Sequence, residues 1–363
     1  MRPSTKTRIA LIFVVVALVT GVIIGLIVNS VITYRVIHET QERIKEALNT
    51  ARWVYTSKIN DIDRTIHLTS IRYILRDALK KEKALSIKDD MARLMTDYGL
   101  DFLTLVDPKG KVLLRFHHPG ISGDSVVEDP FVREALKGRG TSGTQVLSRE
   151  ELLKEGKNLV DKAIFHLIPT PKEKPTEKFE ETSGLALKSA HPVLDANGKV
   201  LGALTGGVLL NRNYEIVDRI KNIVFKDAKY KGKEIGTATI FLGDLRISTN
   251  VMDREGYRAI GTRAMKEVQE QVLQKGLPWI QRAYVVDDWY ITAYEPIRDF
   301  QNKVVGMLYV GILESKYVVL KEKLILLFML GMLTAVSISS YLSFQILKKE
   351  FWEHIHSSQK EKQ

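Results

Sequence analysis

The sequence contains no cysteine among its 363 residues. This excludes disulfide bonds, thiolate metal sites and a cysteine nucleophile, and it leaves the redox compartment undecided. Phosphate-binding glycine loops, the H-E-x-x-H zinc motif and an EF-hand loop are missing as well. No nucleophile with a neighbouring base stands out either. We therefore predict no catalytic site, no metal site and no cofactor.

A basic stripe is also missing, although the formal net charge is +11. Lysine and arginine are interleaved with aspartate and glutamate along the chain, which argues against nucleic acid as a partner. Hydrophobic residues make up 45% of the chain and charged residues 27%, as in a globular protein and not in a disordered or fibrous one. A chain of this length has room for two domains and connecting elements.

What the sequence does contain is two long uncharged runs. Residues 9–32 and residues 324–346 carry no charged side chain over 24 and 23 positions. As helices, both are long enough to cross a hydrocarbon core of about 30 Å. The first is longer than the apolar part of a secretion signal, and no small-residue cleavage site follows it, so we interpret it as an uncleaved anchor. The sequence therefore predicts two transmembrane helices.

The charges around the first run predict its orientation. Three basic residues and no acidic residue precede it, whereas basic and acidic residues nearly cancel beyond it. The positive-inside rule then places residues 1–8 in the cytoplasm. Because the second helix returns the chain, we expect residues of about 33–323 outside the cytoplasm and residues 347–363 as a short cytoplasmic tail.

A long helix is predicted directly after the first membrane helix, over residues 33–80. The stretch from Val36 to about Leu79 contains neither proline nor glycine. Apolar residues recur in it at spacings of three and four, which is the period of one helix face. They are Ile44, Leu48, Ala51, Tyr55, Ile59, Ile62 and Ile66. This stripe packs either on the domains that follow or on a second copy of the helix in a homodimer, and the sequence leaves both open.

The region between the uncharged runs contains one pattern twice. Residues 185–209 and residues 289–313 align without a gap at an offset of 104 positions. The matched residues include Pro192 with Pro296, Gly202 with Gly306, Leu204 with Leu308, and Gly207 with Gly311. Glycines inside strands mark close backbone approach or a bulge. Their shared spacing therefore predicts the same local fold built twice.

Each copy closes a domain with the same predicted order of elements: a hairpin, a helix and three strands. For the first domain, residues 81–210, the elements are hairpin 101–116, helix 129–136, strand 159–168 and the repeated pair, with a charged, exposed loop at 169–181. For the second domain, residues 231–320, they are hairpin 236–249, helix 264–274, strand 279–286 and the repeated pair. A helix within residues 211–230 links the two. Antiparallel sheets with helices on one face predict an α+β fold.

Two membrane helices around such a duplicated region resemble the double-Cache sensor regions of bacterial chemoreceptors and receptor histidine kinases. The resemblance covers nearly the whole region between the helices, and its most specific mark is the spacing P-x9-G-x4-G in both copies. It implies two tandem PAS-like antiparallel-sheet (Cache) domains on one long N-terminal helix, flanked by two transmembrane helices. It also implies a two-pass protein of the bacterial inner (plasma) membrane that senses a small molecule outside the cytoplasm.

The first domain also resembles, more loosely, the single Cache domains of citrate and C4-dicarboxylate sensor kinases. Those domains carry Arg-x-x-His-Pro after the first hairpin and Ala-Leu-Arg before the Pro-Val of the last hairpin. Here the first motif runs from Arg115 to Pro119, and the second reads Ala-Leu-Lys before Pro192. The resemblance implies that Arg115, His118 and Lys188 bind the carboxylates of a small anion. Arginine binds a carboxylate through two parallel hydrogen bonds. The lysine at position 188 cannot reproduce this geometry.

The second domain offers aromatic residues together with one cation. They are Arg282, Tyr284, Trp289, Tyr290 and Tyr294. Strand alternation puts Arg282 and Tyr284 on one face, and Tyr290 and Tyr294 on one face. This predicts an aromatic ligand pocket in the second domain. The alternative is that these aromatic residues are simply part of the core.

The expected function is that of a membrane receptor for a small organic ligand, most simply a carboxylate. Because the tail after the second membrane helix is short, we expect no output domain on the chain and signalling through a separate histidine kinase or chemotaxis component. One alternative is the sensor fragment of a histidine kinase or chemoreceptor. Another is a ligand-binding membrane anchor that transmits no signal. The chain itself is expected not to be an enzyme.

Overall fold

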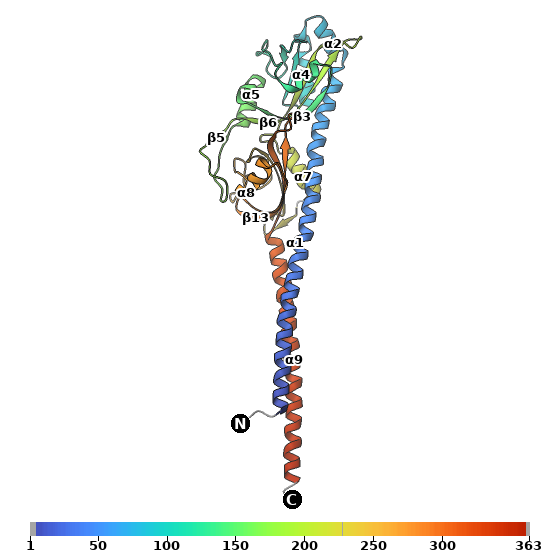
Figure 1. Cartoon of the computed structure of the whole chain (residues 1–363). Helices are drawn as coiled ribbons and strands as arrows, with labels where there is room; N and C mark the ends of the chain where they lie inside the picture. Colours follow the sequence, from blue (N-terminus) through green and yellow to red (C-terminus); the bar gives the residue numbers. More distant parts are fainter. Residues whose placement is uncertain (1–4, 227, 361–363) are drawn as a thin grey trace. The chain divides into compact units, whose positions relative to one another are not determined.

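The computed structural model describes residues 5–226 and 228–360 (Figure 1). Contacts divide the chain into two compact units. One is formed by the two ends of the chain, Met1–Thr40 and Glu314–Gln363, and the other is Gln41–Leu313. The larger unit contains both five-stranded sheets.

Two helices form the unit of the chain ends. Helix α1, Thr5–Ser70, begins in this unit, and helix α9, Ser315–Lys360, follows the last strand. The two helices approach each other where α1 has glycine, because a Cβ atom at Gly21 would stand 2.5 Å from the side chain of Met332. Small residues allow such close approach in membrane helix pairs.

The apolar parts of these helices correspond to the two uncharged runs. Among the described residues, the segment Ser315–Gln345 is long and apolar enough to cross a membrane, and an 18-residue window within it has a mean hydropathy of 2.0. Val19–Val31 is a shorter apolar segment within the first run. Of the two predicted cytoplasmic ends, residues 1–4 and 361–363 lie outside the described residues.

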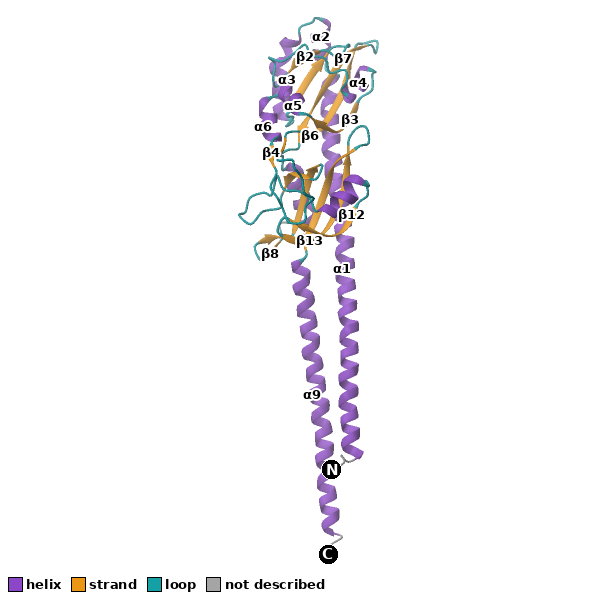
Figure 2. Ribbon diagram, turned by 60° about the vertical axis from the view of Figure 1, so that its left-hand side comes forward, coloured by secondary structure: helices purple, strands orange, loops and turns teal. Residues whose placement is uncertain are grey.

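Beyond Gln41, helix α1 runs beside both sheets of the larger unit (Figure 2). Nearly all of its predicted apolar stripe is buried there. The buried members are Ile44, Leu48, Ala51, Tyr55, Ile62 and Ile66. The stripe therefore packs on the two domains of its own chain, which is the first of the two uses that the sequence left open.

Helix α1 ends at Ser70 and does not continue to residue 79, so the predicted helix was too long. The backbone of Arg72 is extended, with φ −64° and ψ 139°, and helix α2, Tyr73–Lys80, begins after it. The hydroxyl of Ser70 donates a hydrogen bond to the carbonyl oxygen of His67 at 2.8 Å. Serine side chains that bond to the backbone compete with the helical ladder, which explains the break.

The first domain is built on an antiparallel sheet of five strands in the order β2-β1-β7-β6-β3. The strands are β1 (Phe102–Val106), β2 (Val112–Arg115), β3 (Thr141–Leu147), β6 (Gly184–Leu194) and β7 (Val200–Leu209). Before them lie α2, the 3-10 helix η1 (Ala84–Ile87) and α3 (Lys88–Asp97). Between β2 and β6 lie α4 (Pro130–Leu136), α5 (Arg149–Glu155) and α6 (Lys157–Ala163).

The second domain repeats the same strand order as β11-β10-β14-β13-β12. Its strands are β10 (Gly236–Leu242), β11 (Leu245–Thr249), β12 (Trp279–Val285), β13 (Asp288–Arg298) and β14 (Val304–Leu313). Its helices are α7 (Glu215–Phe225), α8 (Lys266–Val268) and the π-helix η2 (Gln269–Gln274). The register repeats too: Thr205 lies opposite Thr104, and Tyr309, 104 positions later, lies opposite Thr239. The predicted α+β fold with tandem domains is confirmed.

The strand predicted at residues 159–168 is wrong. Its first half, residues 159–163, belongs to α6, and within the predicted range only Phe165–His166 form a named strand, β4. Leu159, Val160 and Ala163 are buried at helical spacing, which a short apolar run cannot distinguish from a strand. The third strand is β3 instead, a polar, glycine-containing edge strand with weak sequence signal.

Two short hairpins complete the larger unit. Strand β4 pairs with β5 (Glu180–Glu181), at the end of the segment predicted to be an exposed loop. Strands β8 (Lys229–Tyr230) and β9 (Lys233–Glu234) precede the second sheet. The segment before β5 also contacts the second domain, because Lys266 donates a backbone hydrogen bond to the carbonyl oxygen of Lys172 at 2.9 Å.

Candidate functional site

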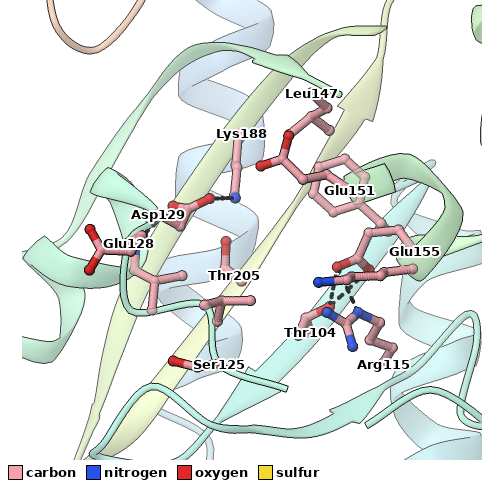
Figure 3. A pocket seen from close by; sticks show the side chains of 14 residues that line it. Thr104, Arg115, Ser125, Glu128, Asp129, Leu147, Glu151, Glu155, Lys188 and Thr205 are labelled. Atoms are coloured by element: carbon pink, nitrogen blue, oxygen red, sulfur yellow. Dashed lines mark hydrogen bonds and ion pairs between the residues drawn. The ribbon is translucent and has the colours of Figure 1, made fainter. Parts of the chain in front are cut away.

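A cavity of about 170 Å³ lies on the face of the first sheet that is turned away from α1 (Figure 3). Strand alternation explains this placement: Lys188 lines the cavity, whereas its neighbour Ser189 bonds to Asp63 of α1 at 2.9 Å on the opposite face. Strands β1, β2, β6 and β7 contribute lining residues, as do α5 and the segment that leads into α4. The charged lining residues are Arg115, Glu128, Asp129, Glu151, Lys154, Glu155 and Lys188.

Arg115 is buried at the end of β2 and is held by two carboxylates. Its Nη1 and Nη2 atoms donate to the two oxygens of Asp124 at 2.7 and 3.0 Å, and its Nε atom donates to Glu155 at 3.1 Å. Thr104 donates a further hydrogen bond to Glu155 at 2.9 Å. The hydrogen bonds from Arg115 hold the pKa of Asp124 at about 2. Both acids occupy the guanidinium edges that a ligand carboxylate would use.

Lys188 is paired as well, with Asp129. Asp129 is also the N-cap of α4, since its carboxylate accepts hydrogen bonds from the backbone nitrogens of Phe131 and Val132 at 2.9 and 3.1 Å. Burial alone would raise the pKa of Asp129, but the charge of Lys188 and the Val132 backbone donor hold this pKa below its ordinary value. One carboxylate thus starts the helix and neutralises the cation.

The other charged residues leave the cavity lined by more acids than bases. The third cation, Lys154, pairs with Asp124 at 3.2 Å. Glu151 accepts a hydrogen bond from the backbone nitrogen of Ser148 at 2.7 Å and forms no ion pair within the part of the chain that the structure describes. The side chain of Glu128 at the rim is 94% exposed. An additional ammonium group therefore fits this cavity better than an additional carboxylate.

His118 does not line this cavity, although the sequence grouped it with Arg115 and Lys188. Strand β2 ends at Arg115, so His118 lies in the loop beyond the sheet. Its side chain is partly buried, and its Nδ1 atom is buried without a hydrogen-bond partner in the described residues. The structure thus brings two of the three predicted residues together.

The carboxylates around Arg115 and Lys188 were missed at the level of sequence. Asp129 had a local signal, because Asp-Pro before an apolar run is typical of a helix start. Asp124 and Glu155 had none, since they lie 9 and 40 positions from Arg115 and meet it only in the folded domain. Among the described residues, no group of three or more side chains could hold a metal ion.

The five residues predicted as a pocket in the second domain lie on two faces of the sheet. Pairing of β12 with β13 puts Tyr284 opposite Trp289, and alternation then places Tyr290 and Tyr294 on the other face. On the first face, Arg282 stacks over the Trp289 ring at 4.0 Å, and Tyr284 contacts that ring edge-on at 5.5 Å. Tyr290 and Tyr294 are buried in the core. A single pocket with Arg282 as its cation is therefore not formed.

Helix α1 contacts the same position of both sheets. Asp63 lies 2.9 Å from Nε2 of His191 on β6, and Nε of Arg52 donates to Glu295 on β13 at 2.8 Å. His191 and Glu295 are 104 positions apart and so occupy equivalent sites of the repeat. Their partners on α1 are separated by about three helical turns. Both strands are therefore joined by side-chain contacts to one face of α1.

Family comparison now assigns the chain to a class of proteins. The family described as "Double sensory domain of two-component sensor kinase" matches residues 39–227, which is more than half of the chain. The family "Single cache domain 3" matches residues 208–324. The protein is thus a tandem Cache sensor, and it belongs to the double sensory domain family of two-component sensor kinases.

Sensor domains are found among the solved structures with a similar fold. The periplasmic domain of Vibrio cholerae LuxQ is 11% identical, and the match covers 74% of this chain and 98% of that one, with a TM-score of 0.42. The sensor domain of the V. cholerae histidine kinase DctB is 10% identical, with coverages of 76% and 98% and a TM-score of 0.42. The ligand-binding domain of the Pseudomonas aeruginosa PAO1 amino acid chemoreceptor PctB, in complex with L-Arg, is 12% identical, with coverages of 77% and 95% and a TM-score of 0.35. No curated protein matches the chain.

Proposed function

We propose that this protein is a membrane-anchored receptor that binds a small organic molecule outside the cytoplasm, in the cavity of its first Cache domain. The observation that carries the proposal is the cavity itself, which is lined by charges of both signs and lies on the sheet face opposite to α1. Membership in a family of sensory domains supports the same function. The ion pair between Asp63 and His191 links the sheet that carries this cavity to α1.

The charges in the cavity favour a ligand that carries an ammonium group, such as a small amine or zwitterion. Glu151 has no cationic partner among the described residues, whereas Arg115 and Lys188 each have an acidic one. A dicarboxylate, the ligand class expected from the sequence, requires Arg115 to separate from Asp124 or Glu155 first. Breaking such a buried pair costs about 3–5 kcal/mol, which the ligand would have to supply.

A ligand screen on the full-length protein in detergent tests this choice. Small amines and amino acids are expected to raise the melting temperature, and succinate and citrate are expected to leave it unchanged. Glu151→Gln should reduce the rise, because it removes the unpaired negative charge. Glu150→Gln is the matched control, since Glu150 is exposed like Glu151 and lies on the same helix but does not line the cavity.

The opposite outcome would support the carboxylate ligand instead. In that case succinate or citrate raises the melting temperature, amines do not, and Arg115→Met abolishes the effect. The same screen thus decides between the two ligand classes, and a protein that responds to neither would not bind small charged molecules in this cavity.

Membrane topology is a separate part of the proposal. We propose that residues of about 33–323 lie outside the cytoplasm and that both termini lie inside. Protease added to intact spheroplasts is then expected to cut within Gln41–Leu313 and to spare epitope tags at both ends of the chain. Tags that are removed while the middle survives would contradict this orientation.

The output is proposed to pass along α1 and α9 to a two-component kinase, as the family match favours. Ligand binding shifts the positions of these helices only if the two helix arrangements differ in ligand affinity. Purified membranes that contain the receptor and the kinase should therefore show ligand-dependent autophosphorylation. A non-signalling anchor, the alternative, would bind the same ligand and leave phosphorylation unchanged.

A further inference from the structure

A second buried arginine lies in the second domain, and it has no acidic partner among the residues that the structure describes. Arg246 on β11 is 1% exposed. Its Nη1 atom donates to the hydroxyl of Thr262, and its guanidinium lies 5.0 Å from the centre of the Phe241 ring. Its Nε atom is buried without a hydrogen-bond partner. Within the described residues, no carboxylate forms an ion pair with this guanidinium.

Arg246 differs in this respect from Arg115. Both are among the largest fully buried side chains of the described chain, and both lie in the second strand of their sheet. Arg115 is neutralised by two carboxylates, whereas the groups next to Arg246 are uncharged. Burial therefore lowers the pKa of Arg246. A buried cation without a counter-ion destabilises a fold, so the position calls for an anion that the chain does not supply.

Tyrosines pack around the Phe241 ring over which Arg246 lies. The ring centres of Tyr294 and Tyr309 are 6.1 and 6.4 Å from that of Phe241, and Tyr290 belongs to the same buried cluster. Burial raises the pKa of each of these tyrosines, so their hydroxyls stay protonated at neutral pH. The Tyr309 hydroxyl is 2.9 Å from Oγ1 of Thr237, and the Tyr294 and Tyr309 rings are 4.7 Å apart. Protonated phenols and a guanidinium together form a set of donors suited to an oxyanion.

A groove leads to this group of side chains. It has a volume of about 760 Å³, and Thr237 and Tyr290 form part of its wall. The remaining wall comes mainly from the β8–β9 hairpin and from residues 252–256. Arg246 itself does not line the groove, but Tyr290 belongs both to the groove wall and to the buried cluster around Phe241.

We propose that Arg246 is the binding residue of a second ligand site, which lies in the second Cache domain and takes a small organic anion with one carboxylate. The anion reaches the guanidinium from the groove, past Tyr290. Its carboxylate accepts hydrogen bonds from Nε of Arg246 and from the tyrosine hydroxyls. This site is independent of the cavity in the first domain, where every lining cation already has an acidic partner.

Formate, the smallest carboxylate, is the probe for this site in the full-length protein in detergent. Sodium formate replaces the sodium salt of a bulky sulfonate at constant ionic strength, and the melting temperature is recorded. For the wild type we expect a rise of about 3–5 °C for each tenfold increase in formate above its dissociation constant. Arg246→Met should lose this rise and should melt above the wild type when formate is absent, because methionine fills the site without a charge.

Two further variants keep the test decisive. Arg282→Met removes an exposed arginine from the same domain and should retain the full rise. Arg246→Lys keeps the charge but lacks the Nε donor, so it should need at least about tenfold more formate for the same rise. A wild type without a formate response, an Arg246→Met variant with the wild-type response, or an unchanged midpoint in Arg246→Lys would each overturn the proposal. None of these outcomes changes the result expected from the ligand screen on the cavity of the first domain.

Discussion

Replacing Arg115 by methionine is expected to lower the free energy of unfolding of the first domain by about 3 kcal/mol. The substitution leaves Glu155 without its cation and Asp124 with Lys154 alone, and the side chains of these acids are only 26% and 15% exposed. It also removes the link between β2, α5 and the segment before α4. Urea denaturation of the full chain, followed by circular dichroism, measures the loss.

A surface ion pair provides the control for this substitution. Arg139→Met breaks a pair with Glu134 in which the arginine side chain is 63% exposed, so we expect a much smaller loss than for Arg115→Met. Equal losses in the two variants would mean that the buried network around Arg115 contributes no more to stability than a solvated pair.

The pH dependence gives a second readout of the same network. The folded pKa of Asp124 is about 2, below its ordinary value of 3.8. A lowered carboxylate pKa adds stability above the ordinary value, and this stability is lost as the pH falls towards the folded pKa. The difference between wild type and Arg115→Met should therefore shrink between about pH 4 and pH 2. A difference that stays constant over this range would contradict the ion-pair account.

Alanine at Gly202 or at Gly306 is expected to destabilise the protein by about 3 kcal/mol, the upper end of the range for overpacking. A Cβ atom at Gly202 would stand 2.2 Å from the carbonyl oxygen of Val106, and one at Gly306 would stand 2.0 Å from that of Phe241. In both cases the obstacle is the backbone of the neighbouring strand, which moves only if ladder hydrogen bonds break. The two substitutions should act on different domains.

Thermal unfolding of the two variants separates these effects. Gly202→Ala should lower the transition of the first domain, and Gly306→Ala that of the second. Gly120→Ala is the control, because nothing lies within 4 Å of its Cβ position, and we expect a change within about 0.5 kcal/mol. Losses no larger than that of the control would show that the repeated glycines have another role than close strand approach.

The repeated glycine and apolar pattern and the local capping signals of the sequence were sufficient to predict the architecture. The offset of 104 positions between the two copies correctly predicted one local fold built twice, because the packing of each strand pair depends on its own glycines and apolar residues. Asp129 before Pro130 correctly indicated the start of α4, since capping involves only the next few residues. The weak signals failed: the polar edge strand β3 was missed, and the apolar run in α6 was taken for a strand.

The sites depended on contacts between distant parts of the chain. From the sequence, Arg115 was predicted to bind a ligand carboxylate. Folding instead places the carboxylates of Asp124 and Glu155 against it. Arg246 stands between Leu245 and Ile247, a pattern that predicts a solvated side chain, yet both faces of β11 are buried.

By itself, the sequence determined the duplicated α+β fold and the two apolar runs, because hydrophobic period and glycine spacing act over a few residues at a time. Only the tertiary structure decided which charges are neutralised, because a charge is compensated by whatever the fold brings within hydrogen-bonding distance. That is why, in the described part of the chain, Arg115 has two acidic partners and Arg246 has none.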